Sequence, residues 1–390
     1  MAQENSYIPM FNPHEMVSNA FCFKLCSDLT KFAIEFLYKK HFFKKSARNF
    51  LHSLTKNINK KDFFVDRNLY NLSENWNVIS SYQNHSSSNF PAYPKVIYIG
   101  LLNVCNIGCP TCPWFSKEHS KTLKNSYFDI IRKLDRVAIE TILDYASEGD
   151  CRLVFSGPGE PLLEENLLEY IKSAQQKGIS QIEVATNGLL LTREKMLKMV
   201  EYGVSKVSLS IAFSNETYLG LADDTLEKYK ETLQSIFKEL LEKQVKIEVY
   251  LTIMYEAEYV KDFLEFLMSV QEYSFIVYSI SVVSSSGIKG NIEDMGVQLV
   301  GTSRHTCSSP LAALYIFPDG SVGLCDRARF LLGRVEVEEL SIGSIYKQDL
   351  SKIWNGAAHK KIVKHSLEMN FDELSQCKSC NKWWNEMEMF

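Results

Sequence analysis

The sequence predicts an α/β protein whose central part is a sheet of parallel strands. From Pro94 onward, short runs rich in β-branched residues alternate with longer segments that repeat apolar residues at helical spacing. Parallel strands joined by crossover helices have this alternation. The chain before this region is helical in pattern and rich in lysine, and cysteines return near the C-terminus. We therefore expect a helical N-terminal extension and linker (1–92), an α/β domain (93–290) and a small cysteine-bearing domain (291–390).

Composition narrows the class of protein. The 390 residues include 43 basic and 47 acidic side chains, a net charge of -4, so no electrostatic footprint for nucleic acid is visible. The N-terminus lacks the features of a secretory signal, and no apolar window is long enough to span a membrane. We expect a cytoplasmic protein, in which the ten cysteines are metal ligands or free thiols rather than disulfides.

The N-terminal extension has one long amphipathic pattern. Apolar residues recur near helical spacing over residues 17–50 and are interrupted by lysines. Such a helix could lie on a membrane surface, but packing against the rest of the protein is the favoured interpretation. Cys22 and Cys26, four residues apart on this helix, are interpreted as small buried hydrophobic side chains.

The central domain contains six expected strands joined by helices. The strands are predicted at 96–102, 152–156, 181–186, 206–212, 246–254 and 275–283, and the helices at 136–148, 165–177, 193–202, 225–243 and 260–273. From the pattern alone, these elements could form a partial barrel or an open doubly wound sheet. In both architectures, ligands gather at the carboxyl ends of the strands.

Three cysteines follow the first expected strand at a spacing of C-x3-C-x2-C. They are Cys105, Cys109 and Cys112. Three thiolates on one loop can hold three irons of a cubane and leave the fourth iron open, whereas a structural zinc site requires four protein ligands. The pattern therefore favours a cluster with an open iron at which chemistry can occur.

A second motif stands at the end of the next expected strand. Ser156-Gly157-Pro158-Gly159-Glu160-Pro161 follows that strand, and Thr186-Asn187-Gly188 follows the third. Together with the cysteine loop, these turns resemble the radical S-adenosylmethionine (SAM) superfamily. The resemblance implies a partial (β/α)6 TIM-like barrel, a SAM-binding 4Fe-4S cluster, and a turn that receives the methionine amino group. The residues implied for cofactor binding are Gly157, Gly159, Glu160, Pro161 and Asn187.

Two serines of the fourth expected strand complete the candidate SAM site. Ser208 and Ser210 share one strand face and could donate to a ribose or a carboxylate, or instead form cross-strand hydrogen bonds. The loop departs from the commonest family form at Thr111, where an aromatic residue usually precedes the last cysteine, and Trp114 follows shortly after.

The C-terminal cysteines resemble a SPASM or twitch domain. Gly320 to Cys325 has its G-x4-C turn, and the ligands implied are Cys307, Cys325, Cys377 and Cys380. Four thiolates would saturate one auxiliary 4Fe-4S cluster, which would transfer electrons or anchor the fold. A zinc site with four cysteine ligands has the same spacing and remains open.

The resemblance implies reductive cleavage of SAM to a 5'-deoxyadenosyl radical, which abstracts hydrogen from a C–H bond. We expect a small-molecule substrate, such as a carbohydrate or a natural-product intermediate, and a reductant such as flavodoxin or ferredoxin. One alternative is maturation of a ribosomally made peptide by crosslinking, epimerisation or oxidation, although residues 1–92 show no leader-binding module.

A third alternative is an iron–sulfur electron carrier or a zinc-stabilised binding protein without catalysis, and the turn at Gly157–Pro161 argues against it. No catalytic acid, base or hydrogen donor is assigned. Tyr98 and Cys151 are interpreted as core residues.

Overall fold

The computed structural model describes residues 91–370, together with Asp372 and Cys377. Within 91–370 the exceptions are 111, 214–220, 223, 256–264, 267–268, 271–272, 274, 283–308, 326–327, 329–330 and 369. The described residues all belong to one compact unit, Ser88–Glu386. The predicted helix at 17–50, with Cys22 and Cys26, lies outside the described residues.

The described residues form one nine-stranded sheet in the order β6-β5-β4-β3-β2-β1-β7-β8-β9. Its first six strands run parallel, and each pairs with its neighbour in sequence. They are β1 (Val96–Gly100), β2 (Arg152–Ser156), β3 (Ile182–Thr186), β4 (Val204–Phe213), β5 (Glu248–Tyr255) and β6 (Ile276–Val282). The six predicted strands are therefore present.

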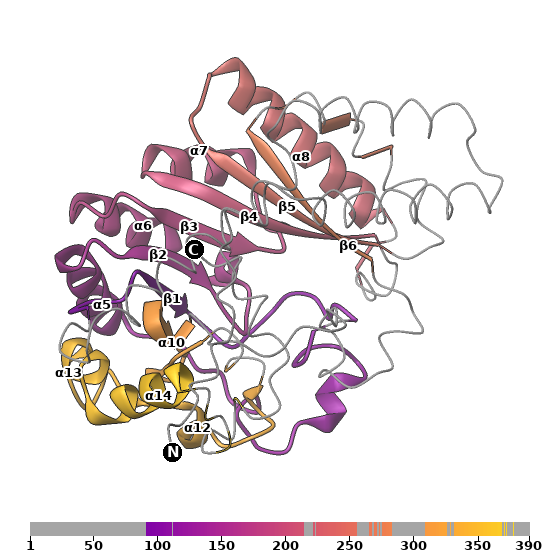
Figure 1. Cartoon of the computed structure of the whole chain (residues 1–390). Helices are drawn as coiled ribbons and strands as arrows, with labels where there is room; N and C mark the ends of the chain where they lie inside the picture. Colours follow the sequence, from indigo (N-terminus) through magenta and orange to yellow (C-terminus); the bar gives the residue numbers. More distant parts are fainter. Residues whose placement is uncertain are drawn as a thin grey trace, which may run out of the picture. The chain divides into compact units, whose positions relative to one another are not determined.

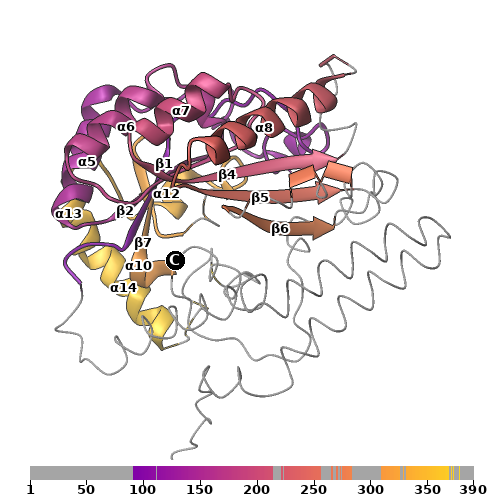
Figure 2. The same cartoon turned by 90° about the horizontal axis from the view of Figure 1, so that it is seen from above.

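Four described helices connect these strands: α5 (Arg136–Glu148), α6 (Leu167–Gln176), α7 (Arg193–Glu201) and α8 (Thr225–Glu242). Figures 1 and 2 show them side by side along one face of the sheet. A doubly wound sheet would reverse its strand order and carry helices on both faces. A sheet wound in one direction is the architecture of a partial barrel, so the predicted fold class is confirmed.

The element boundaries agree closely with the predictions. Strand β4 begins two residues earlier than predicted, and its pairing with β3 shifts in register between Ile182 and Glu183. Most of the predicted helix at 260–273 falls outside the described residues. Within this range, residues 265–266 and 269–270 are described and are helical.

The two faces of the parallel sheet differ in polarity. Alternate residues such as Ile97, Phe155 and Val207 are fully buried, as are the apolar residues Ile139 and Phe237 on the helices. Successive side chains of a strand point to opposite faces, so the residues between them form the other face. That face includes polar side chains: Tyr98, Glu183, Lys206 and Ser208. The apolar face packs against the helices, which leaves the polar face for the barrel interior.

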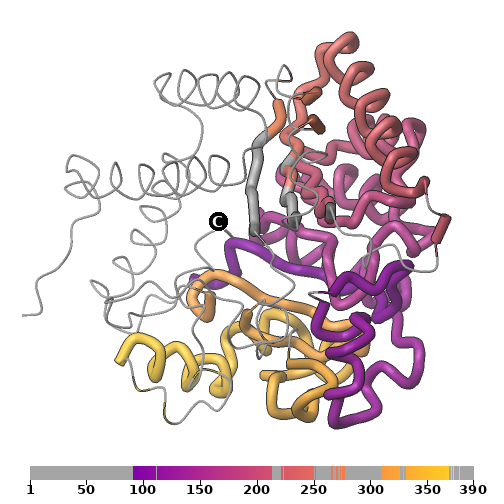
Figure 3. The backbone as a smooth tube through the Cα atoms, turned by 90° about the vertical axis from the view of Figure 1, so that its right-hand side faces the viewer, coloured from indigo at the N-terminus to yellow at the C-terminus, as the bar shows by residue number. Residues whose placement is uncertain are grey.

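The C-terminal segment continues the same sheet beyond β1. Strand β7 (Ala313–Ile316) runs parallel to β1, and β8 (Ser321–Gly323) and β9 (Gly343–Ser344) follow antiparallel. Figure 3 shows this orange-to-yellow segment beside the indigo segment that contains β1. The turn at Pro318 to Gly320 thus joins two antiparallel strands of a hairpin, while the domain boundary at residue 291 stays a prediction.

Four described helices accompany the C-terminal strands: α10 (Ser309–Ala312), α12 (Val337–Leu340), α13 (Leu350–Trp354) and α14 (Ala357–Leu367). Helix α10 contacts β7 and α12 contacts β8, whereas α14 packs on α10 and α13. His359 on α14 is fully buried, with one ring nitrogen 2.5 Å from Trp354 O and the other 2.7 Å from Pro310 O. The indole of Trp354 donates to Pro91 O at 2.7 Å. These contacts hold the C-terminal helices against the chain that enters β1.

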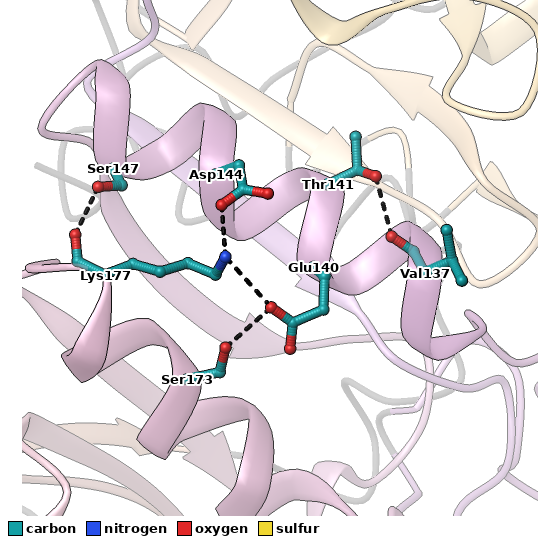
Figure 4. A network of polar contacts seen from close by, with 7 residues as sticks. All are labelled: Val137, Glu140, Thr141, Asp144, Ser147, Ser173 and Lys177. Carbon is teal, nitrogen blue, oxygen red and sulfur yellow. Dashed lines mark hydrogen bonds and ion pairs between the residues drawn. The ribbon is translucent and has the colours of Figure 1, made fainter.

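A polar network joins α5 to α6 (Figure 4). The Lys177 ammonium pairs with Asp144 and lies 3.3 Å from Glu140 Oε2, which also accepts from Ser173 at 2.9 Å. Partly exposed pairs of this kind contribute little to stability, so the buried apolar faces hold these helices. None of the described helices has both the length and the apolar character needed to cross a membrane.

Helices α7 and α8 are joined by a clamp whose strength depends on pH. Both oxygens of the buried Glu239 accept from the Arg193 guanidinium, one of them at 2.8 Å, and Lys243 lies 3.2 Å away. These partners, Arg193 first, lower the pKa of Glu239 to about 2. A lowered folded-state pKa stabilises the protein above the unfolded value of about 4.3, and this contribution is lost as pH falls towards 2.

We therefore expect Glu239→Gln to lower the midpoint of urea unfolding at pH 7. The difference from the unmodified chain should shrink steadily below pH 4.5. Glu242→Gln is the matched control, because Glu242 lies on the same helix in an exposed pair with Lys238 at 4.0 Å. A constant difference across this pH range would contradict the clamp.

Candidate functional site

Asn103 anchors the chain where it leaves β1. Its side chain is 3% exposed and donates from Nδ2 to Tyr127 O and Ile130 O, both at 3.0 Å. Its Oδ1 accepts from Arg132 N at 2.8 Å. The amide thus bonds to residues on the far side of the cysteine loop and draws together the two chain segments that flank it. Sequence analysis did not find this residue, since an asparagine before a loop has many ordinary roles.

The three cysteines of the loop, Cys105, Cys109 and Cys112, are half-buried thiols. Burial raises the pKa of Cys105 to about 11 and that of Cys109 to about 12. Repulsion from Glu160 and from the neighbouring cysteine thiolates contributes to both increases. A cationic partner such as iron would favour the ionised set.

The loop itself is tightly turned. Cys112 N donates to Cys109 O at 2.8 Å, and Phe115 N lies 3.3 Å from Cys112 Sγ. Within the part of the chain that the structure describes, no three His, Cys, Asp or Glu side chains converge closely enough to hold a single metal ion. A cubane has a different requirement, since each thiolate binds its own iron.

Aromatic side chains and the C-terminal segment contact the residues that follow the cysteine loop. Trp114 is 6% exposed, and its ring centroid lies 6.0 Å from that of Phe128. Asn125 N and Lys124 N donate to Gly333 O, the first at 3.1 Å. The neighbouring Arg334 donates to Pro113 O at 3.3 Å, directly after the last cysteine of the loop.

The turn after β2 packs against the start of the cysteine loop without room for a side chain. A Cβ atom on Gly159 would lie 2.4 Å from Val104 O and 2.5 Å from Leu102 O. Glu160 N donates to Val104 O at 2.8 Å. Glycine is needed here because two backbones approach each other directly.

The carboxylate of Glu160 joins this turn to the turn after β3. Its Oε1 accepts from Leu162 N at 2.9 Å and from Thr186 Oγ1 at 2.5 Å, while Oε2 accepts from Asn187 N at 2.8 Å. The side chain is 2% exposed, and this burial raises its pKa. Pro161 follows as the first residue of the 3-10 helix η2 (Pro161–Leu163).

Asn187 lies between the turn and the cysteine loop. Its Nδ2 is 2.7 Å from Asn106 Oδ1 and 3.8 Å from Cys105 Sγ. The next residue, Gly188, has a φ of 73°, and a Cβ there would lie 2.1 Å from the Tyr229 hydroxyl. The fold therefore brings together predicted residues from two groups, the cysteine loop and the strand-end turns.

The two predicted serines of β4 have different surroundings. Ser208 donates to Glu183 Oε1 at 2.7 Å, which is the cross-strand alternative, and Lys206 pairs with Glu183 Oε2 at 3.1 Å. Ser210 is exposed. Sequence analysis missed Glu183 and Lys206, because a charged residue within a strand pattern is most often on a solvated face.

Two of the four C-terminal cysteines, Cys325 and Cys377, lie within the described residues, and both are half-buried. Cys307 and Cys380 lie outside the described residues. Ser309, two positions after Cys307, donates to Leu324 O at 3.3 Å, one position before Cys325.

The remaining residues considered for chemistry are packed in the core. Tyr98 is 6% exposed and its ring stacks 5.9 Å from that of Tyr315. Cys151 is 2% exposed and precedes β2, at the opposite end of the strand from the Gly157–Pro161 turn.

The chain is similar to curated proteins, to solved structures and to two family models. The curated relatives include a GTP 3',8-cyclase of Clostridium perfringens, 31% identical over 147 residues, which are 36% of this chain and 43% of that protein. A 7,8-dihydro-6-hydroxymethylpterin dimethyltransferase of Methanocaldococcus jannaschii is 31% identical over 138 residues, which are 35% of this chain and 25% of that protein. The chain thus spans less than half the length of these relatives.

A solved structure of BtrN in complex with AdoMet and 2-DOIA aligns with a TM-score of 0.47 and 18% identity. The alignment covers 74% of this chain and 92% of that chain.

Two family models match consecutive segments of the chain. Residues 99–267 match the radical SAM superfamily, and residues 307–381 match SPASM, an iron–sulfur cluster-binding domain. The first match contains the cysteine loop and both strand-end turns, and the second contains all four C-terminal cysteines. The chain thus contains a radical SAM domain, followed by a SPASM domain.

Proposed function

We propose that this protein is a radical SAM enzyme that abstracts hydrogen from a C–H bond of a small polar molecule. The observation that carries the proposal is the junction of the cysteine loop with the two strand-end turns. Three thiols stand on one loop, and Asn187 joins that loop to the Glu160 carboxylate. Cys105, Cys109 and Cys112 would hold a 4Fe-4S cluster with one open iron.

Held by these three cysteines, the cluster would supply the one electron that reductive cleavage of SAM to methionine and a 5'-deoxyadenosyl radical requires. The chain's own task is to hold the methionine end. Glu160 Oε2 accepts a hydrogen bond from Asn187 N. A carboxylate oxygen has a second lone pair, which would accept a hydrogen bond from the methionine ammonium. Gly159 holds this carboxylate in place, because it lets the turn pack directly against the backbone that leads into the cysteine loop.

The interior face of the barrel supports a polar substrate. Glu183, Lys206 and Ser208 form a hydrogen-bonded network on the strand face opposite the helices. The similarity to a GTP 3',8-cyclase and to a pterin dimethyltransferase also favours a small molecule. Peptide maturation is the second candidate, because the match to a SPASM domain does not distinguish a peptide substrate from a small molecule.

The second cysteine group would hold an auxiliary 4Fe-4S cluster through Cys307, Cys325, Cys377 and Cys380. The bond from Ser309 to Leu324 supports this, because it joins the segment after the first of these ligands to the strand end before the second. Four thiolates leave no iron open, so the site suits electron transfer from a substrate radical rather than substrate binding.

Anaerobic reconstitution should yield about eight irons per chain, four for each cluster, and negligible zinc. With dithionite and SAM, the protein should form methionine and 5'-deoxyadenosine. Replacement of all three loop cysteines by alanine should abolish this cleavage and remove about four irons. Iron-loaded protein that fails to cleave SAM, even with pools of candidate substrates, would instead indicate an electron carrier.

The substrate class can be tested with the same assay. Pools of small polar metabolites should stimulate 5'-deoxyadenosine formation several-fold. A pool of synthetic peptides that stimulates while the metabolites do not would favour peptide maturation.

Gly159→Ala should destabilise the protein by about 2 kcal/mol and reduce SAM cleavage, because the added Cβ would overlap two backbone oxygens. The free energy of unfolding and the rate of 5'-deoxyadenosine formation are the measurements. For the free energy of unfolding, Gly157→Ala is the matched control in the same turn, since a Cβ there meets its nearest atom at 3.3 Å. Equal losses of unfolding free energy in the two variants would contradict the close-approach argument.

Cys377→Ala should reduce the iron content from about eight to about four per chain, while substrate-independent cleavage of SAM persists. Cys151→Ala is the control for loss of a thiol, because Cys151 is buried and lone, and its iron content should not change. A metal content of four irons and one zinc in the unmodified chain would show that the second cysteine group holds zinc and not an auxiliary cluster.

A further inference from the structure

The side-chain amide of Asn187 has a determined orientation. Its Oδ1 accepts from Leu189 N at 3.0 Å, so its NH2 group must face the other way, towards the cysteine loop. There Nδ2 lies 2.7 Å from Asn106 Oδ1 and 3.8 Å from Cys105 Sγ. The two N–H bonds thus have two acceptors, one oxygen and one sulfur.

Binding of Cys105 to an iron changes the hydrogen-bonding role of its sulfur. As a thiol, Cys105 can donate to Asn106 Oδ1, which lies 3.8 Å away. As a cluster ligand it is a thiolate and only accepts, so the N–H of Asn187 becomes a charge-assisted donor to the sulfur. Asn187 also occupies Asn106 Oδ1, which would otherwise present an unbonded acceptor to the thiolate.

We propose that Asn187 is a positioning residue that raises the reduction potential of the open-iron cluster through its N–H···S hydrogen bond to Cys105. The inference rests on the proposed function. Hydrogen bonds to cluster sulfurs withdraw negative charge and stabilise the reduced state, which is one of the ways a protein tunes such clusters. Loading the cluster with an electron from the cell's reductant is therefore easier with this amide in place.

The position of Asn187 also links this tuning to the SAM-binding turn. Its backbone N–H donates to Glu160 Oε2 at 2.8 Å, the same oxygen that has a lone pair to offer the methionine ammonium. One residue thus contacts the carboxylate on one side and the cluster ligand on the other. A change in the position of either group alters the N–H···S geometry.

The test is an EPR-monitored redox titration of the reconstituted full chain, in which the signal altered by SAM identifies the open-iron cluster. Asn187→Leu removes the donor. Asn187→Asp keeps the size and the acceptor for Leu189 N but adds negative charge in place of the donor. Asn166→Leu is the matched control, because Asn166 donates its amide to Glu164 Oε1 at 3.1 Å and contacts no cysteine in the described structure.

We expect both Asn187 variants to keep the iron content of the unmodified chain and to shift the midpoint potential of this cluster to more negative values. The shift should be larger for aspartate, and the Asn166 variant should match the unmodified chain. Unchanged potentials in iron-loaded Asn187 variants would overturn the inference alone. An unmodified chain that binds iron without any SAM-sensitive signal would overturn the proposed function and this inference with it.

Discussion

The site depends on one close contact between two backbones. The turn after β2 meets the chain leaving β1 at Gly159, where a Cβ would lie 2.4 Å from Val104 O. Because β1 and β2 are parallel neighbours, their carboxyl ends come to the same edge of the sheet. The contact converts this general closeness into a fixed relation between the cysteine loop and the carboxylate of Glu160, and Asn187 extends it to the third strand.

The division of the sheet into an apolar and a polar face explains where chemistry can take place. The four described helices between β1 and β5 cover one face (Figure 2), and burial of their apolar sides against that face supplies most of the packing. The other face carries Glu183 paired with Lys206, groups that are costly to bury without partners. A barrel interior with such groups suits a polar ligand better than further packing.

The C-terminal segment is structurally part of the barrel rather than an appendage. Strand β7 hydrogen-bonds along the free edge of β1, the strand from which the cysteine loop emerges. Gly333 and Arg334 then reach back to the residues after that loop. Cys325 follows β8, which is separated from β1 by β7 alone, so the same sheet carries the cysteine loop and this C-terminal cysteine.

The amino-acid sequence by itself determined the elements and the ligand types. Alternation of strand and helix patterns predicted six parallel strands, and the spacing of Cys105, Cys109 and Cys112 predicted a site with three thiolates, because these are local properties of the chain. The tertiary structure decided what no local pattern contains. In the folded chain the six strands β1 to β6 follow one another in a single direction, and β7 pairs with β1. Ser208 donates to Glu183, and the amide of Asn187 faces Cys105. Each of these depends on residues far apart in sequence that meet only when the sheet forms.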